Sequence, residues 1–283
     1  MKILIVGENS FIGRGVGAWF AKKQPAPEVE YISVRDDGWK NMDLSPYDGV
    51  IFAAALVHRP EVKDWEQYEQ LNVILPVTFA KYAKAQGVKQ FLFFSSVSVY
   101  AVGRSLPAHR QIDANTPLKP AAFYGKSKFQ AEQQLQQLMD ESFCVSVVRP
   151  VFVYGKGCRG KHVAVLEKLA KKLPVLPRAF TDVKMGMVYI DNLAELCWLI
   201  VNSSCSGIYH AQDKEPLSTY EVFHTICPQK RSISCTGLFR PFMKTKLIRK
   251  LFGGFKYTEE VAACKLGEYR VMSAEEGIRR TVM

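Results

Sequence analysis

Two short stretches of the sequence bring together side chains that can move a proton. Tyr124 and Lys128 lie four residues apart in a stretch without helix breakers, so a helix would place both on one face. An ammonium near a phenol lowers the phenol's pKa, which suits a group that exchanges protons near neutrality. Ser96 and Ser98 follow an apolar run at 90–94, and a serine hydroxyl there can bind the oxygen whose proton moves. A Tyr-x-x-x-Lys spacing alone also occurs on ordinary surface helices.

The first fourteen residues predict the elements that would bring a nucleotide cofactor to this pair. Residues 2–6 are an apolar run typical of a strand buried on both faces, and residues 7–13 are typical of a tight turn into a helix. Gly7 lets the chain turn without a Cβ, and Gly13 lets the helix lie close to the strand. The free N–H groups at the helix N-terminus can then bind a pyrophosphate. A strand, such a turn and a helix predict a dinucleotide-binding unit.

The rest of the first half alternates strands with helices. Further strands are expected at 29–34, 49–52, 91–95 and 144–150, and helices at 14–23, at 68–86 and from 124 onward. This alternation predicts an α/β protein with a doubly wound parallel sheet (a Rossmann fold) and a ligand site at the carboxyl ends of the strands. We expect a dinucleotide-binding domain at 1–150 and a smaller substrate-binding lobe at 151–283, between which the chain can cross.

Composition limits the classes of function. The sequence has no apolar run of membrane-spanning length and no export signal at its start, so a cytoplasmic protein is expected. Its seven cysteines include no C-x-x-C pair, and its five histidines show no ligand spacing, which predicts neither a disulfide framework nor a metal site. The net charge of +11 is concentrated near the C-terminus. Without interleaved aromatic residues or a nucleic-acid module, this excess does not indicate nucleic-acid binding.

The basic stretch 239–252 has two interpretations. From residue 242 on, its apolar residues recur at near-helical spacing, with Lys246, Arg249 and Lys250 between them. A helix packed over the substrate pocket is the ordinary interpretation. The alternative is peripheral contact with an anionic membrane surface.

The turn, the serine cluster and the Tyr/Lys pair together resemble the extended short-chain dehydrogenase/reductases, the NAD-dependent epimerase/dehydratase family that acts on nucleotide sugars. The family's G-x-x-G-x-x-G turn is present with Ser10 in place of the middle glycine. Stretches 149–155 and 188–192 also resemble the family, so the resemblance covers nearly the whole chain. It implies cofactor contacts at Gly7, Ser10, Phe11, Ile12, Gly13, Asp43, Leu44, Ala53, Ala54, Ala55, Lys128 and Pro150.

The resemblance also implies the catalytic residues. In the family the catalytic serine lies four residues before the tyrosine of a Val-Tyr pair, which is Ser96 here, with Ser98 as its competitor. Tyr124 and Lys128 match the catalytic tyrosine and lysine. Lys184 matches an arginine that often binds the substrate diphosphate. Substrate contacts are therefore expected from Ser96, Ser98, Tyr124 and Lys184.

Two further positions carry over from the family. Asn72 matches an asparagine that holds the central strands together, and Phe152 replaces an asparagine that often touches the sugar nucleotide. The dehydratases of the family carry Asp-Glu directly after the catalytic serine, whereas this sequence has Val97-Ser98. Dehydration is therefore not expected.

The residue after the second strand faces the adenosine ribose in this unit. Arg35 lies there and would accommodate the additional phosphate of NADP, while Asp36 directly after it would favour NAD. We favour NADP slightly over NAD.

The family's chemistry gives two candidate reactions and one alternative of another class. The first is reduction of a UDP-4-keto-6-deoxy-sugar for surface polysaccharide synthesis, with hydride transfer at C4. The second is 4-epimerisation of a UDP-sugar with retained NAD. In both, Tyr124 exchanges a proton with the sugar O4, Ser96 holds that oxygen, and Lys128 lowers the tyrosine pKa. The alternative is a non-catalytic NAD(P)-binding redox sensor or chaperone-like protein. The resemblance also implies a homodimer that is packed through two helices.

Overall fold

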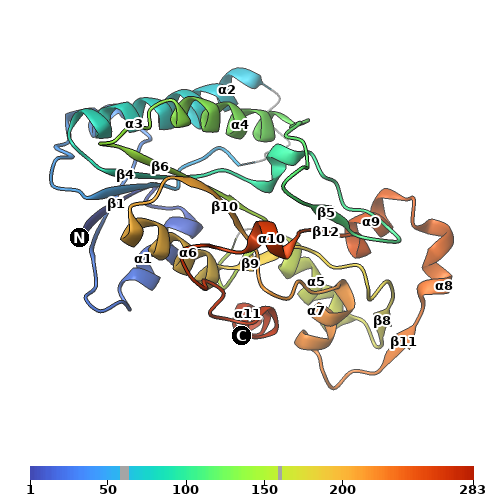
Figure 1. The fold of residues 1–283 in the computed structure, drawn as a ribbon. Coiled ribbons are helices and arrows are strands. Elements are labelled where there is room, and N and C mark those ends of the chain that lie inside the picture. The colour runs from blue at the N-terminus through green and yellow to red at the C-terminus, as the bar shows by residue number, and fades with distance from the viewer. Residues whose placement is uncertain (58–63, 159–160) are drawn as a thin grey trace.

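In the computed structural model, which describes residues 1–57, 64–158 and 161–283, a six-stranded sheet runs through the middle of the molecule (Figure 1). The strands lie in the order β10–β6–β4–β3–β1–β2, and all neighbouring pairs are parallel. The strand order reverses at β1 and β3, so the predicted doubly wound α/β fold is confirmed. The strand bounds are β1 Lys2–Val6, β2 Glu28–Ile32, β3 Gly49–Phe52, β4 Gln90–Phe94, β6 Cys144–Pro150 and β10 Gly207–Ala211.

The central strands are apolar throughout because alternate side chains enter two different cores. In β1, Ile3 and Ile5 belong to one hydrophobic cluster, whereas Leu4 and Val6 belong to the other. β4 alternates in the same way. Burial on both faces is typical of parallel sheets, and each such side chain contributes about 1.5–3 kcal/mol of transfer free energy. The sheet is therefore a rigid platform for the loops at its carboxyl edge.

Helices cover both faces of the sheet (Figure 1). Helices α2, α3 and α4 lie over one face, and α1 and α6 pack against each other on the opposite face. A π-helical turn, η2 (Gln70–Ile74), joins α2 to α3 without a break in the helical rod. The helix bounds are α1 Phe11–Phe20, α2 Trp65–Glu69, α3 Leu75–Ala85, α4 Phe123–Gln136 and α6 Ile190–Ser203.

A smaller part of the molecule lies beyond the carboxyl edge of the sheet. Its short parallel pairs are β5 (Arg110–Ile112) with β12 (Phe255–Tyr257), β7 (Phe152–Tyr154) with β9 (Met187–Tyr189), and β8 (Leu176–Arg178) with β11 (Ser232–Ser234). Because α6 and β10 return to the large sheet, the chain crosses between the two parts. The helices of this part are α5 Lys161–Lys172, α7 Thr219–Ile226, α8 Thr236–Phe239, α9 Lys246–Phe252, α10 Glu259–Ala262 and α11 Ala274–Val282.

Some predicted bounds differ from those observed. The first helix begins at Phe11 and not at Arg14, because Ser10 caps its N-terminus. The second strand ends at Ile32, two residues before its predicted end, where the Ile32 carbonyl accepts hydrogen bonds from the Gly7 and Glu8 N–H groups. Stretch 239–252 is not one helix, because the 3₁₀ turn η4 (Arg240–Phe242) follows α8 and α9 begins only at Lys246. Among the described residues, no helix is long and apolar enough to cross a bilayer.

Candidate active site

The first turn brings the backbone of β1 against the end of β3, at the point where the strand order reverses. Gly7 has φ +108°, a left-handed conformation that favours glycine, and a Cβ there would lie 2.9 Å from the Ala54 nitrogen. Ala53 and Ala54 are partly exposed and Ala55 is exposed. Small residues on both sides let the turn pack directly on the backbone that follows β3. This cradle fits a dinucleotide, which binds at such a switch point in doubly wound sheets.

Ser10 takes the place of the family's middle glycine as a helix cap. Its Oγ accepts a hydrogen bond from the Gly13 N–H at 3.2 Å, and α1 begins at Phe11. The remaining N–H groups of the first helical turn, including those of Phe11 and Ile12, face the same end of the helix. The first turn therefore retains free donors where a pyrophosphate would bind.

Arg35 and Asp36 differ in what holds their side chains. The Asp36 carboxylate caps the 3₁₀ turn η1 (Asp37–Asn41) by accepting from the Gly38 N–H at 3.0 Å. The Arg35 side chain is exposed, and no described residue pairs with its guanidinium. The arginine is thus available to a ligand, whereas the aspartate already has a structural partner.

Arg14 is a neighbour of this site that the sequence analysis did not identify. Its Nε donates to the Glu8 carbonyl at 2.5 Å, and its guanidinium lies 4.3 Å from the centroid of the Tyr31 ring. These contacts hold a second arginine beside the first turn and the second strand. The contact could not be recognised from sequence because Arg14 lies on α1 and Tyr31 on β2.

The remaining predicted cofactor residues are not all placed for contact. Asp43 is exposed and accepts from the Ser45 N–H at 2.9 Å. The Leu44 side chain is wholly buried in the core between β3 and α3, and its N–H donates to Gln86. A cofactor contact at this position stays a prediction, and the buried side chain would not make it. Pro150 is buried at the carboxyl end of β6, beside Ala211 of β10.

The serine cluster folds into the 3₁₀ turn η3 (Val97–Tyr100) at the end of β4. Ser96 caps this turn, with its Oγ accepting from the Ser98 N–H at 3.1 Å and lying 3.1 Å from the Ser98 Oγ. The two hydroxyls therefore lie close together. The 3₁₀ turn brings them together, and not the alternation of side chains along a strand. The Ser96 hydroxyl also hydrogen-bonds the Tyr124 side chain. The structure thus brings Ser96, Ser98 and Tyr124 together.

Electrostatics at Tyr124 differs from the sequence expectation. Burial raises its pKa to about 12, and the Ser96 hydrogen bond lowers it only in part. Lys128 does not lower the pKa of Tyr124 here, because its Nζ donates instead to the Phe94 carbonyl at 2.7 Å. Burial lowers the pKa of Lys128 to about 7, partly opposed by Glu132. The phenol is thus a neutral proton donor at pH 7, and the lysine titrates near neutrality.

Two contacts that the sequence analysis missed set the position of α4. A Cβ on Gly125 would lie 2.5 Å from the Ser98 carbonyl oxygen, so only glycine lets the helix approach the serine turn this closely. Ser127 donates to the Tyr124 carbonyl at 2.9 Å and accepts from Asn72 at 3.0 Å. Asn72 also hydrogen-bonds both backbone groups of Leu56. The asparagine thus ties the loop after β3 to α4, which carries Tyr124 and Lys128.

Lys184, the predicted diphosphate ligand, is paired with a carboxylate. Its Nζ lies 2.6 Å from each carboxylate oxygen of Glu221. Burial would raise the pKa of Glu221, but Lys184 and the Ser218 hydrogen bonds lower it. Glu221 also accepts from the Ser218 N–H at 2.6 Å in the capping box of α7. A substrate diphosphate would therefore have to displace Glu221 from Lys184.

The Phe152 ring lies beside the guanidinium of Arg104. The ring is half-exposed, and the Arg104 guanidinium lies 5.2 Å from the ring centroid. Arg104 also lies 3.2 Å from Nδ1 of His162, and burial lowers the pKa of that histidine to about 3. No described acidic residue pairs with Arg104. An aromatic ring and a cation without a described acidic partner thus lie side by side in the smaller part.

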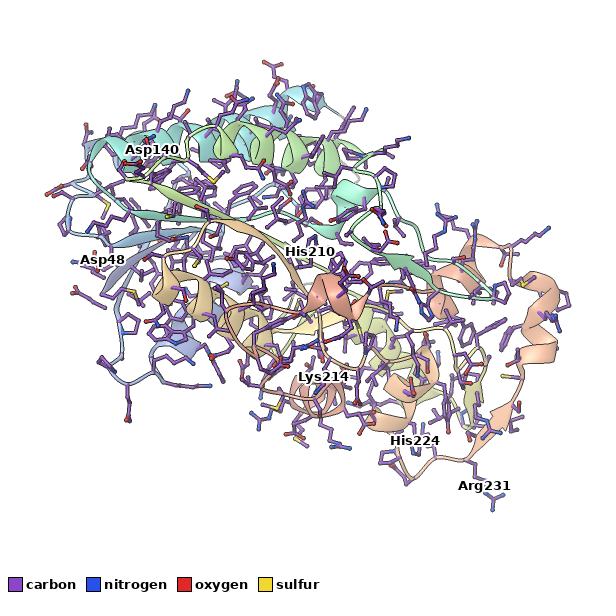
Figure 2. All side chains as sticks on the ribbon, in the orientation of Figure 1. Asp48, Asp140, His210, Lys214, His224 and Arg231 are labelled. Carbon is purple, nitrogen blue, oxygen red and sulfur yellow. The ribbon has the colours of Figure 1, made fainter. Side chains whose placement is uncertain are left out.

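A buried ion pair supports the serine turn from behind. Arg149 on β6 forms two hydrogen bonds to Glu132 on α4, at 3.0 and 2.6 Å, and one to the Tyr100 hydroxyl at 2.7 Å. The Tyr100 hydroxyl also lies 2.7 Å from Nε2 of His210, which Figure 2 labels on β10 near the middle of the molecule. Burial lowers the pKa of His210 to about 4, so it is neutral at pH 7. This network fixes η3, α4 and two strands relative to one another.

The doubly wound sheet and the turn after β1 are those of a dinucleotide-binding protein, and comparison with known proteins agrees. The chain belongs to the NAD dependent epimerase/dehydratase family, whose model matches residues 3–210. It is an NAD(P)-dependent enzyme of the extended short-chain dehydrogenase/reductase type, and the predicted family and enzyme class are confirmed.

Three relatives illustrate this membership. UDP-glucose 4-epimerase of Vibrio cholerae is 28% identical over 309 residues, which cover 99% of this chain and 94% of that protein. An N-acetyl-alpha-D-glucosaminyl-diphospho-ditrans,octacis-undecaprenol 4-epimerase of Escherichia coli O157:H7 is 28% identical over 237 residues, covering 78% of this chain and 70% of that protein. The structure of RMD from Pseudomonas aeruginosa, complexed with NADPH, superposes with a TM-score of 0.74 at 17% identity, covering 100% of this chain and 98% of that one.

Proposed function

We propose that this protein is an NADP-dependent reductase of a nucleotide-linked 4-keto sugar, with a UDP-linked 4-keto-6-deoxy sugar as the substrate class. The observation that carries the proposal is the difference between Arg35 and Asp36. The guanidinium is exposed and without a described partner, whereas the carboxylate caps a turn. A guanidinium can hold a ribose 2′-phosphate with two charge-assisted hydrogen bonds. A reductase draws on NADPH, so this preference favours reduction.

The residues around Tyr124 suit reduction of a carbonyl. The Ser96 and Tyr124 hydroxyls would hydrogen-bond the carbonyl oxygen, and Tyr124 would give that oxygen its proton as the carbonyl becomes an alcohol. The nicotinamide, when bound, supplies the hydride that reaches the carbonyl carbon. Because burial keeps the phenol protonated at pH 7, the acid is in the correct state for this direction. Lys128 would bind the nicotinamide ribose, and Gly7, Ser10 and Gly13 would hold the pyrophosphate.

UDP-sugar 4-epimerisation is the second candidate. Its support is that two of the three relatives described above are named 4-epimerases and that the match to one of them covers 99% of this chain. An epimerase retains its nucleotide, rotates the keto sugar and returns the hydride to the other face.

Analysis of the bound nucleotide separates the two reactions. The protein is purified and denatured, and released nucleotide is identified by chromatography. The native protein is then titrated with NADPH and NADH. A reductase is expected to release little nucleotide, to bind NADPH more tightly and to oxidise it when a nucleotide 4-keto-6-deoxy sugar is added. Stoichiometric release of NAD, with interconversion of UDP-sugars that needs no added cofactor, would overturn the proposal in favour of the epimerase.

A further inference from the structure

The segment from β11 through α9 packs one of its two faces against the body of the molecule. Ile248 and Phe252 of α9 are buried against Phe180, with 5.9 Å between the centroids of the two phenylalanine rings. The Phe239 ring of α8 lies 5.2 Å from that of Phe252. The segment is therefore packed firmly onto the rest of the fold. Its other face is exposed although the segment is held in place.

The outward face is apolar. Leu238, Phe242 and Leu247 are exposed to 68%, 55% and 73%, and with Phe239, Thr245 and Ile248 they line a groove of about 370 Å³. Single exposed apolar residues are ordinary, but a contiguous group marks an interaction site. We call Leu238, Phe242 and Leu247, together with the neighbouring cations, the α8–α9 surface. Figure 1 shows it at the right-hand end of the molecule, away from the N-terminus.

The charge around this surface has one sign. The sequence contains no Asp or Glu between Glu221 and Glu259, while it contains eight Lys and Arg residues there. In and beside α9, Lys244, Lys246, Arg249 and Lys250 are exposed, and none of them forms an ion pair with a described residue. Arg231, at the start of the same segment, points away from the molecule in Figure 2.

We propose that the α8–α9 surface binds an anionic lipid bilayer. A bilayer offers acyl chains for the apolar side chains and acidic headgroups for the cations at adjacent depths, which matches this arrangement. A nucleic acid would attract the cations but would leave Leu238 and Leu247 without a partner. A second copy of this chain would place these cations against one another if the same surface were used on both sides. The bilayer is the partner that fits both the apolar residues and the charge.

The α8–α9 surface belongs to the smaller part of the molecule, where the substrate is expected. Arg104, which stacks on Phe152, also donates a hydrogen bond to the Lys250 carbonyl at the end of α9. A bilayer bound at α9 would therefore lie next to Arg104 and Phe152.

Sedimentation with vesicles tests the proposal. The full-length protein is mixed with vesicles of phosphatidylcholine alone or with a third of phosphatidylglycerol, at low and high salt. We expect recovery with the anionic vesicles only, and reduced recovery at high salt because the Debye length shortens. Phe242→Ser/Leu247→Ser and Lys246→Ser/Lys250→Ser should each lower the partition coefficient by about ten-fold or more. All four side chains are exposed, so the variants should keep the wild-type Tm.

Matched controls make the result decisive. Met139→Ser changes an exposed apolar residue elsewhere, and Arg279→Ser/Arg280→Ser removes two cations from α11; neither should change vesicle binding. Equal recovery with neutral and anionic vesicles would overturn the proposal. So would an unchanged partition coefficient in both α8–α9 variants, or a shift from dimer to monomer in those variants without any vesicle binding by the wild type.

Discussion

At the scale of single residues, Tyr124 shows how strongly its surroundings set its chemistry. Its phenol is held by Ser96, and burial raises its pKa to about 12. Lys128, one turn away, is occupied by the Phe94 carbonyl. Burial therefore keeps the phenol protonated at pH 7, and it also makes the phenol a weaker acid than a free tyrosine.

Replacing the proton donor should remove the chemistry and leave binding intact. Tyr124→Phe keeps the ring and loses the hydroxyl, so turnover should fall by about 10²–10⁴-fold. The Kd for NADPH, measured by fluorescence titration, should stay within about two-fold. Tyr82→Phe, which removes a hydroxyl bound to the Met42 carbonyl, is the control and should keep wild-type turnover. Turnover of Tyr124→Phe close to that of wild type would refute the mechanism.

Arg35 should decide which cofactor binds. Hydrogen bonds to charged groups contribute about 1.5–3 kcal/mol, so Arg35→Ala should weaken NADPH binding by about ten-fold to a hundred-fold. NADH lacks the 2′-phosphate, and its affinity should not change. Lys40→Ala removes a nearby cation that is paired with Asp37 and should affect neither cofactor. Equal weakening of both cofactors in Arg35→Ala, or a wild type that prefers NADH, would contradict this role.

At the scale of elements, the close approach of α4 to the serine turn is what brings Tyr124 to Ser96. Gly125→Ala would place a Cβ 2.5 Å from the Ser98 carbonyl oxygen, so the helix or the turn must shift. We expect a loss of about 1–3 kcal/mol in unfolding free energy. Turnover should fall by about 10²-fold, since a misplacement of about 1 Å has that effect. Gly103→Ala, which meets no atom within 4 Å, should retain both stability and turnover.

The buried pair between α4 and β6 should dominate the stability of the same region. Glu132→Gln leaves the Arg149 guanidinium buried without a carboxylate, which typically destabilises a protein by about 3–5 kcal/mol. Chemical denaturation would measure this loss. Glu167→Gln, which breaks the more exposed pair with Lys171 on α5, should change stability by less than about 1 kcal/mol. Similar losses of unfolding free energy in both variants would show that the buried pair stabilises the fold no more than the exposed pair does.

Elements could be predicted from sequence where the signal is local. Buried parallel strands produce apolar runs, so β1, β3 and β6 were placed within a residue of their observed bounds. The serine turn and the Tyr/Lys spacing were also recognisable. Gly125, Ser127 and the pairing of Lys184 with Glu221 could not be predicted, because each depends on packing between segments distant in the chain. The burial of the Leu44 side chain could not be predicted either, because an apolar residue beside a loop shows no sign of which way it points.

At the scale of the whole molecule, the buried carboxyl of Asp213 should make stability depend on pH. Burial raises its pKa to about 6, against hydrogen bonds from Tyr154, Asn192 and the Tyr189 N–H. Its unfolded pKa is about 3.9, so between about pH 4 and 6 the folded state holds a proton that the unfolded state has lost. Stability from this group is therefore fully present below pH 4 and is lost as pH rises through 6.

The Asp213→Asn variant isolates this effect from other titrating groups. The unfolding free energy of wild type minus that of Asp213→Asn should decrease by about 3 kcal/mol between pH 4 and 7, at about 1.4 kcal/mol per pKa unit. The subtraction removes the opposite contribution of His162 and His210, whose lowered pKa values destabilise the fold in acid. A difference that stays flat across this range would show that Asp213 titrates normally.

The position of β10 has a consequence for how the chain is made. Synthesis proceeds from the N-terminus, so β6 leaves the ribosome about sixty residues before β10, the strand that covers its outer edge. Helix α1 likewise lacks its packing partner until α6 has been synthesised. Until Ala211 has emerged, the nascent chain presents an apolar strand with unpaired N–H and C=O groups, which is a template for pairing with other chains. A ribosome pause before β10 has emerged would therefore prolong the exposure of this strand edge to other chains.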